Sequence, residues 1–85
     1  MKNYCITYDL NKSDKNYDGL YTAIKIFNNV HVMDSVWFVK TNLNASQIYD
    51  KLKPEIDNND NLFICEITSD HSGWLPKSVW DWLKS

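Results

Sequence analysis

The chain has 85 residues, which is enough for one domain with a single hydrophobic core. Hydrophobic residues make up 44% of it and four residues are tryptophan, a composition that argues against intrinsic disorder. The net charge is −2 and every basic residue is a lysine. Arginine is the side chain that grips phosphates bidentately and stacks on bases, so its absence weighs against sequence-specific nucleic-acid recognition.

The N-terminal apolar run is interrupted by Asp9, so it lacks the hydrophobic region of a signal peptide. No apolar stretch approaches membrane length. Cys5 and Cys65 each lie inside an apolar run, and the ordinary interpretation is two buried free thiols. Two cysteines at this spacing indicate neither a zinc site nor a disulfide framework. We therefore expect a cytoplasmic protein with no membrane association.

The first half of the chain predicts a strand, a helix and a hairpin. Residues 3–8 are rich in Tyr, Ile and Thr and predict a strand, which a polar loop follows. Residues 17–28 predict a helix with Asn16 as N-cap, since apolar side chains recur at helical spacing. Residues 30–33 and 35–41 are β-like runs that meet at Asp34 and Ser35, and they predict a hairpin.

The second half predicts a helix, a strand and a short terminal helix. Asn44 and Gln47 have the spacing of a capping box, and Pro54 should end or kink the helix that follows. The run "LFICEI" at 62–67 is apolar at nearly every position, which favours a strand that is central or covered on both faces. Pro76 marks the start of a last helix of one or two turns.

This order of elements predicts an α+β domain over residues 1–85 with the ferredoxin-like βαββαβ plan. Two right-handed crossovers around a central hairpin give a four-stranded antiparallel sheet with two helices on one face. The other face is left open, and so aromatic a chain is not expected to leave it wet. We expect a homodimer with a two-fold axis that closes this face, and we assign Trp37, Trp74 and Trp80 to contacts with that copy or another protein partner.

In this plan Asp9 ends a strand that runs antiparallel to both of its neighbours. The residue should therefore lie near Asp34 and Ser35 on one side and near Asp60 and Asn61 on the other. Neighbouring carboxylates open to water are ligands for Mg²⁺ or Mn²⁺, and such an ion could polarise a phosphodiester and activate water. The alternative is that Asp9 only ends the strand, because Asp, Asn and Ser are common in turns for local reasons.

Lysines and histidines elsewhere in the chain are further candidates for a role in binding. Lys12 and Lys15 follow Asp9 and could meet a phosphate, although both also fit a solvated turn. His31 and His71 are too far apart in the sequence to indicate a metal site, so we expect them to be ordinary strand or loop residues. The tryptophans could stack on bases, but at these spacings they are more typical of core or interface positions.

Several short motifs resemble a known family. "YDL" after the first strand, "DSVWFVKT" in the middle and "DNLFICEI" near the end resemble the small CRISPR adaptation subunit, CRISPR-associated protein two, and the VapD toxins. The "TYDL" opening, the "DS-W-VKT" centre and the "GWLP…W-WL" ending are most similar to a group of short, uncharacterised bacterial and phage proteins related to both.

The resemblance implies a ferredoxin-like homodimer. In the first two families the aspartate that ends the first strand is credited with binding the metal for phosphodiester cleavage, paired across the dimer axis. That position is Asp9 here, and the family's serine at the start of the third strand matches Ser35. The resemblance thus implies Asp9 and Ser35 as catalytic residues, with Asp9 as the metal ligand and Ser35 near it. The family's nucleic-acid contacts use arginines, which this sequence does not contain.

Three functions are consistent with these patterns. The first is a homodimer that engages phosphodiester compounds, as a metal-dependent phosphodiesterase or ribonuclease in which Asp9 and Asp34 hold Mg²⁺ or Mn²⁺. The second is a non-catalytic phage or bacterial binding protein that sequesters a nucleotide or inhibits a defence protein. The third is a scaffold subunit of a larger complex that docks through its Trp-bearing tail.

Overall fold

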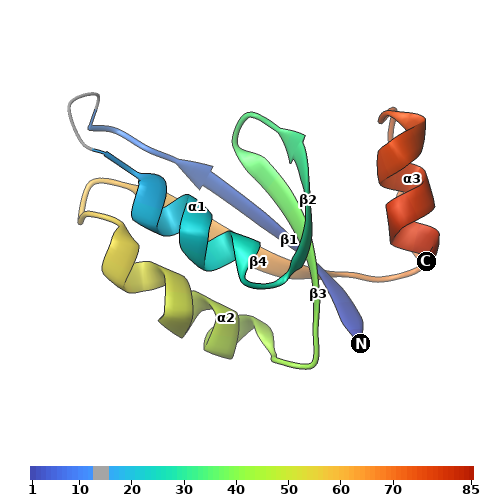
Figure 1. Ribbon diagram of the computed structural model, residues 1–85, viewed down its shortest axis with the longest axis horizontal. Coiled ribbons are helices and arrows are strands. Elements are labelled where there is room, and N and C mark those ends of the chain that lie inside the picture. Colours follow the sequence, from blue (N-terminus) through green and yellow to red (C-terminus); the bar gives the residue numbers. More distant parts are fainter. Residues whose placement is uncertain (13–15) are drawn as a thin grey trace.

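The computed structural model describes residues 1–12 and 16–85, and its elements follow the predicted order (Figure 1). Together they form the predicted α+β domain. The elements are β1 (Lys2–Asp9), α1 (Asp18–Lys25), β2 (Asn28–Met33), β3 (Val36–Thr41), α2 (Ala45–Leu52), the 3-10 turn η1 (Lys53–Glu55), β4 (Asn61–Ile67) and α3 (Lys77–Lys84).

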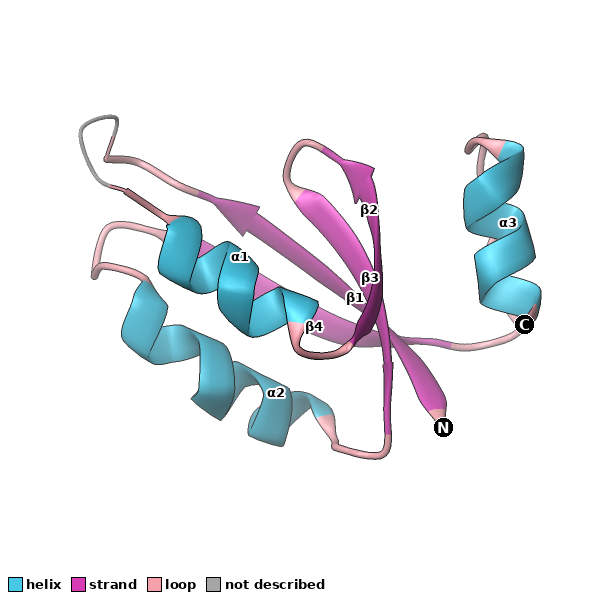
Figure 2. Cartoon of the chain, viewed as in Figure 1, coloured by secondary structure: helices cyan, strands magenta, loops and turns pink. Residues whose placement is uncertain are grey.

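The four strands form one antiparallel sheet in the order β2-β3-β1-β4, which is compatible with the ferredoxin-like plan. In the centre of β1, Ile6 is paired with Trp37 of β3 and with Ile64 of β4. The β2–β3 ladder has an irregularity between His31 and Met33. Helices α1 and α2 lie together on one face of this sheet (Figure 2). No helix in the described ranges is both long and apolar enough to cross a membrane.

The ends of the helices follow from local side-chain chemistry. The predicted capping box of α2 is present: Asn44 Oδ1 accepts from the Gln47 N–H at 2.9 Å, and Gln47 Oε1 accepts from the Asn44 N–H at 2.9 Å. This satisfies two of the free N–H groups at the helix start. At α1 the N-cap is Tyr17 instead of Asn16, whose Oδ1 accepts from the Asp18 N–H at 2.8 Å.

The hydrophobic core lies between the sheet and helices α1 and α2. Strand alternation sends every second side chain of β1 to this side, and Tyr4, Ile6 and Tyr8 are buried there, while Lys2 at the strand's start is exposed. Leucine and isoleucine side chains of the two helices close the core from the other direction. The core comprises Tyr4, Ile6, Tyr8, Leu20, Ile24, Trp37, Val39, Ile48 and Leu52.

Helix α3 packs against the opposite face of the sheet, so that face is only partly open. Trp82 donates from Nε1 to Asn28 Oδ1 at 3.2 Å and packs against Phe38 with 6.5 Å between ring centroids. The Lys40 ammonium lies 4.1 Å from the centroid of the Trp82 ring. These contacts cover the β2–β3 half of the face, and Figure 1 shows α3 well separated from α1 and α2. We call the remaining β1–β4 half, carrying Cys5, Thr7, Asp9, Asn61, Phe63 and Cys65, the open half-face.

Two predictions about buried residues are wrong. Strand β4 is an edge strand, since β1 is its one neighbour among the described strands, and it is not covered on both faces. Phe63 is therefore 63% exposed in a single chain. The thiols are also not both buried: Cys65 is exposed and Cys5 is partly buried, since both point to the open half-face.

Candidate functional site

Asp9 is the last residue of β1 and is exposed. It alternates with the buried Tyr8, so it shares the open half-face with Cys5 and Thr7. Its direct partner on β4 is Asn61. The backbone of β1 is held on the other side by the Tyr8 N–H, which donates to the Ser35 carbonyl at 3.2 Å. The strand ends thus meet at one rim of the sheet, as the sequence predicts.

A shallow depression lies at this rim. Its lining combines the Asp9 carboxylate with a hydroxyl, an amide and an aromatic ring from β1 and β4. The lining residues are Thr7, Tyr8, Asp9, Asn61, Leu62 and Phe63. Asp9 is the only acidic residue that the strands β1, β3 and β4 place on this face. Of the side chains on these strands, Asp9 alone would offer a ligand here a negative charge.

Asp34 and Ser35 form the turn between β2 and β3, and both are exposed. Their interactions use main-chain oxygens. The Asp34 carbonyl accepts from Tyr8 Oη at 3.2 Å and lies 3.3 Å from His31 Nε2. Both Asp34 contacts are with side chains on the helix side of the sheet, whereas Asp9 projects to the open half-face. The structure thus brings the three predicted residues to one rim, but as separate exposed groups.

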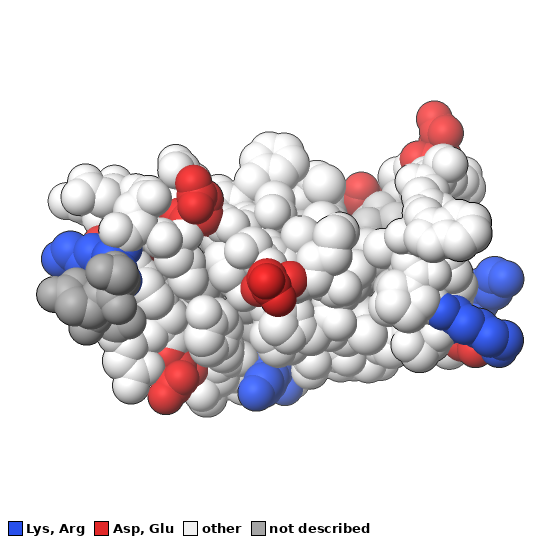
Figure 3. Space-filling model, turned by 90° about the horizontal axis from the view of Figure 1, so that it is seen from above, with Lys and Arg blue, Asp and Glu red and all other residues white. Residues whose placement is uncertain are grey.

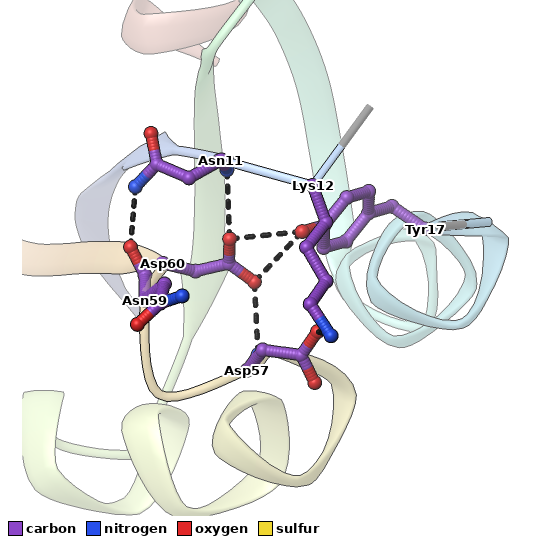
Figure 4. A network of polar contacts seen from close by, with 6 residues as sticks. All are labelled: Asn11, Lys12, Tyr17, Asp57, Asn59 and Asp60. Atoms are coloured by element: carbon purple, nitrogen blue, oxygen red, sulfur yellow. Dashed lines mark hydrogen bonds and ion pairs between the residues drawn. The ribbon is translucent and has the colours of Figure 1, made fainter. Parts of the chain in front are cut away.

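Asp60 has a different role from the other acidic residues at this end. It is 8% exposed, and its carboxylate accepts from the N–H groups of Asn11 and Asp57, both at 2.8 Å (Figure 4). The Tyr17 hydroxyl donates to both carboxylate oxygens, at 2.8 and 2.9 Å. A buried carboxylate surrounded by donors is a structural acceptor. Asp60 ties the loop after β1 to the loop before β4 and is not available as a metal ligand beside Asp9.

The same network engages the first of the two candidate phosphate-binding lysines. Lys12 Nζ lies 3.4 Å from Asp57 Oδ2, and the Asn11 side-chain amide donates to the Asn59 carbonyl (Figure 4). Lys12 is exposed, so it can still reach a phosphate, but Asp57 partly neutralises its charge. Lys15 lies outside the described residues. Burial and the hydrogen bond to Asp60 raise the pKa of Tyr17, which keeps its phenol protonated as the donor.

The described residues of a single chain do not provide a complete metal site. Within residues 1–12 and 16–85, no group of three or more His, Cys, Asp or Glu side chains is placed to hold an ion. Asp9 and Asp34 alone supply too few oxygens for Mg²⁺ or Mn²⁺, which take about six ligands. From the described residues alone, a protein-held ion would need a second copy to contribute its own Asp9, with water filling the remaining positions.

The three predicted contact tryptophans lie in different environments. Trp37 is 4% exposed, and its Nε1 donates to Tyr8 Oη at 3.0 Å. Its assignment as a dimer or partner contact is therefore wrong, because strand alternation turns its side chain into the core. Trp74 is 99% exposed, and Trp80 is partly buried with its ring stacked near His71. These two remain candidates for contacts with a partner.

Both histidines make local contacts within the chain. His31 stacks on Trp37 with 4.0 Å between ring centroids, and His71 Nδ1 lies 2.6 Å from the Thr68 carbonyl. Charged side chains are scattered over the face seen in Figure 3, where the described lysines form no continuous track. A broad electrostatic surface for nucleic acid is thus absent from the described part of that face.

The loop network around Asp60 was missed at the sequence level. The signal that could have found it is the Asp57–Asp60 spacing, because an aspartate side chain can bond the backbone of the residue three positions before it. The long-range partners Asn11 and Tyr17 have no comparable local signal. They depend on the two loops meeting at the same end of the sheet.

Comparison with known proteins bears on the fold. A crystal structure of a hypothetical protein, TT1823 from Thermus thermophilus, superposes with a TM-score of 0.66 over 88% of this chain and 94% of that one. The two sequences are 20% identical, so the similarity concerns architecture alone. No protein-family model and no curated protein matches the sequence.

Proposed function

We propose that the protein is a homodimer that pairs through the open half-face and engages phosphodiester compounds, either nucleic acid or a nucleotide, at the rim marked by Asp9. The observation that carries the proposal is the position of Asp9, which is exposed at the end of the central strand β1 beside a shallow depression. A buried or hydrogen-bonded carboxylate would have supported a purely structural role.

The case for a homodimer rests on the open half-face. Phe63 is 63% exposed at its centre, and the Cys65 and Thr7 side chains flank it on the same face. A second copy related by a two-fold axis would cover the same residues on both chains. If the axis passes near the end of β1, it also brings the two Asp9 carboxylates together.

In such a pair the two Asp9 side chains would hold one Mg²⁺ or Mn²⁺, and the exposed Asp34 and Ser35 groups would lie near it. The ion supplies charge that polarises a phosphodiester and lowers the pKa of a bound water. The likeness of the "TYDL" and "DSVWFVKT" motifs to CRISPR-associated protein two and the VapD toxins supports this arrangement. Catalytic roles for Asp9 and Ser35 come from that likeness.

The test is cleavage of RNA, DNA and cyclic dinucleotides with and without Mn²⁺ or Mg²⁺. We expect metal-dependent turnover that falls at least about a hundredfold in Asp9→Asn, because a lost metal ligand removes several kcal/mol of transition-state stabilisation. Asp50→Asn is the matched control, since Asp50 is exposed on α2 far from the rim in sequence. Turnover that persists in Asp9→Asn while the dimer is intact would contradict the proposal.

A non-catalytic binding protein on the same scaffold is the second candidate. It is favoured by the incomplete donor set of the described residues in a single chain. Such a protein would retain a nucleotide, or block a defence protein, without turnover and without sensitivity to chelators. Mass spectrometry of small molecules that co-purify with the chain separates it from the enzyme.

A scaffold subunit is the third candidate, and the exposure of Trp74 favours it. The 99% exposed side chain lines a depression with Trp80 and Leu75 in the segment that leads into α3. Trp74→Ala is the sharper test than truncation of residues 74–85, because truncation would also remove the packing of Trp82 on the sheet. Loss of a defined binding partner in Trp74→Ala, with full stability, would support docking through this segment.

A further inference from the structure

The two cysteines are 60 positions apart in the sequence but face each other across the sheet. Cys5 of β1 and Cys65 of β4 are direct partners in the antiparallel ladder. Directly opposed residues project to the same face, which here is the open half-face. Cys65 is exposed and Cys5 is partly buried, so solvent reaches the pair from the Cys65 side.

The backbone spacing suits a covalent bond between them. The Tyr8 N–H points to β3, so the N–H groups of the alternate residues of β1, including Cys5, point to β4. Cys5 and Cys65 are then a hydrogen-bonded pair with Cα atoms about 5.5 Å apart. That separation lies inside the range of about 4.4–6.8 Å found in disulfides.

The thiols already affect each other in the reduced chain. Burial raises the pKa of Cys5 to about 11, and the neighbouring Cys65 adds to the shift through its charge and a hydrogen bond. This mutual influence follows from the direct pairing of the two residues across β1 and β4.

We propose that Cys5 and Cys65 form a reversible oxidation site that closes to an intramolecular disulfide by exchange with a low-molecular-weight disulfide. The exposed Cys65 sulfur attacks one sulfur of the small disulfide as a thiolate and releases the other as a thiol. Cys5 then attacks the Cys65 sulfur, expels the second small thiol and gives up its proton to it. The two cysteines lose two electrons and two protons, and the small disulfide becomes two thiols.

The bond should be readily reversible. Cβ atoms of directly opposed strand residues are about 4.5–5.5 Å apart, whereas disulfides prefer about 3.5–4.5 Å, so closure must pull the strands together. Strain of this kind makes a disulfide easier to reduce. Because β4 is an edge strand, it can yield without disturbing the β1–β3 pairing. The inference rests on strand register and does not depend on the proposed function.

The experiment uses oxidised glutathione as the probe, with alkylation of the remaining thiols and measurement of the intact mass. The folded wild-type chain should lose the mass of two hydrogen atoms and take up no alkylating agent. Cys5→Ser should instead accumulate a stable mixed disulfide at Cys65, since the resolving thiol is missing. Raising the pH should accelerate closure in the wild type, because the Cys5 thiolate becomes more abundant.

A denatured sample is the reference for the contribution of the fold. In urea the same two thiols must close a long flexible loop. At the same ratio of oxidised to reduced glutathione, the equilibrium constant for disulfide formation should therefore be at least about tenfold larger in the folded chain. The reaction is run at two protein concentrations, since a dimer on this face would slow it at the higher one. A wild-type product that is only a mixed or intermolecular disulfide at both concentrations, or no gain over the denatured chain, overturns the proposal.

Discussion

The two faces of the sheet are built from the same strands, but other parts of the chain cover them to very different degrees. On the helix side of β1, Tyr4, Ile6 and Tyr8 are at most 7% exposed and are enclosed by α1 and α2. On the other side only the β2–β3 half is covered, by the short helix α3. The open half-face holds exposed Asp9, Phe63 and Cys65. The buried side chains of the helix-side face supply the hydrophobic core that drives folding. The open half-face is not needed for that core and is therefore available for binding and chemistry.

The largest expected effect is a loss of folding stability on the helix side of the sheet, which a substitution on the open half-face should not cause. Ile6→Ala should lower the free energy of unfolding by about 2–5 kcal/mol, because the side chain is fully buried and leaves a cavity. Phe63→Ala, on the opposite side of the sheet, should change it by no more than about 0.5 kcal/mol in the monomer but weaken self-association at least about tenfold. Urea denaturation and sedimentation equilibrium measure the two effects. Similar losses of folding stability in both variants would remove the distinction between the faces.

Asp60→Asn tests whether the buried acidic residue at the rim is structural. We expect a loss of about 1–3 kcal/mol, since an amide cannot accept all the donors that now surround the carboxylate. The control is Asp50→Asn on α2, where the exposed ion pair with Lys53 should contribute less than about 0.5 kcal/mol. Urea denaturation at neutral pH provides both values. An Asp60→Asn variant as stable as the wild type would contradict the structural role of this carboxylate.

Trp82→Ala tests how firmly α3 covers its half of the sheet. Loss of the Phe38 and Lys40 ring contacts and of the bond to Asn28 should cost about 1–2 kcal/mol. Hydrogen exchange should then rise in α3 and β2 but not in α1. Trp74→Ala is the matched control, since its side chain is 99% exposed and should leave stability unchanged. Equal effects of the two substitutions would mean that α3 is not held by Trp82.

The smallest expected effect is an alkaline change in stability. The pKa of Cys5 is raised from 9.0 to about 11, so the folded state favours the neutral thiol and stability is lost as the pH rises above 9. The pKa values of Tyr8 and Tyr17 are also raised from 10.0, chiefly by burial, so their contributions are lost at higher pH. Cys5→Ala should flatten the decline between pH 9 and about 11, and the part that comes from the two tyrosines above pH 10 should remain. Melting temperatures of the wild type and of Cys5→Ala across this pH range test the prediction, and equal slopes for both would contradict it.

Much of the architecture could be predicted because it follows from local chemistry. Asn44 and Gln47 form the expected capping box, and Pro76 stands at the start of α3. The alternation of residues along β1 correctly predicts a buried side and a more exposed side of the strand. The order of elements then leaves few topologies for a chain of this size.

What the sequence could not decide is which side of each strand is covered, and by what. Trp37 follows the same alternation as Val39 and Thr41, and the fold turns all three inward. The apolar run of β4 indicated a covered strand, yet it forms an edge whose outer face is bare in one chain. The long-range partners of Asp60 are fixed by the packing of two loops, which no local pattern encodes.

The most direct test of the account is Mn²⁺ binding measured by calorimetry together with the molecular mass in solution. We predict a dimer that binds one ion per pair of chains, and an Asp9→Asn variant that remains a dimer but binds none. A wild-type chain that is monomeric, or an Asp9→Asn variant that binds Mn²⁺ as the wild type does, would contradict the assignment of the Asp9 rim as the functional site.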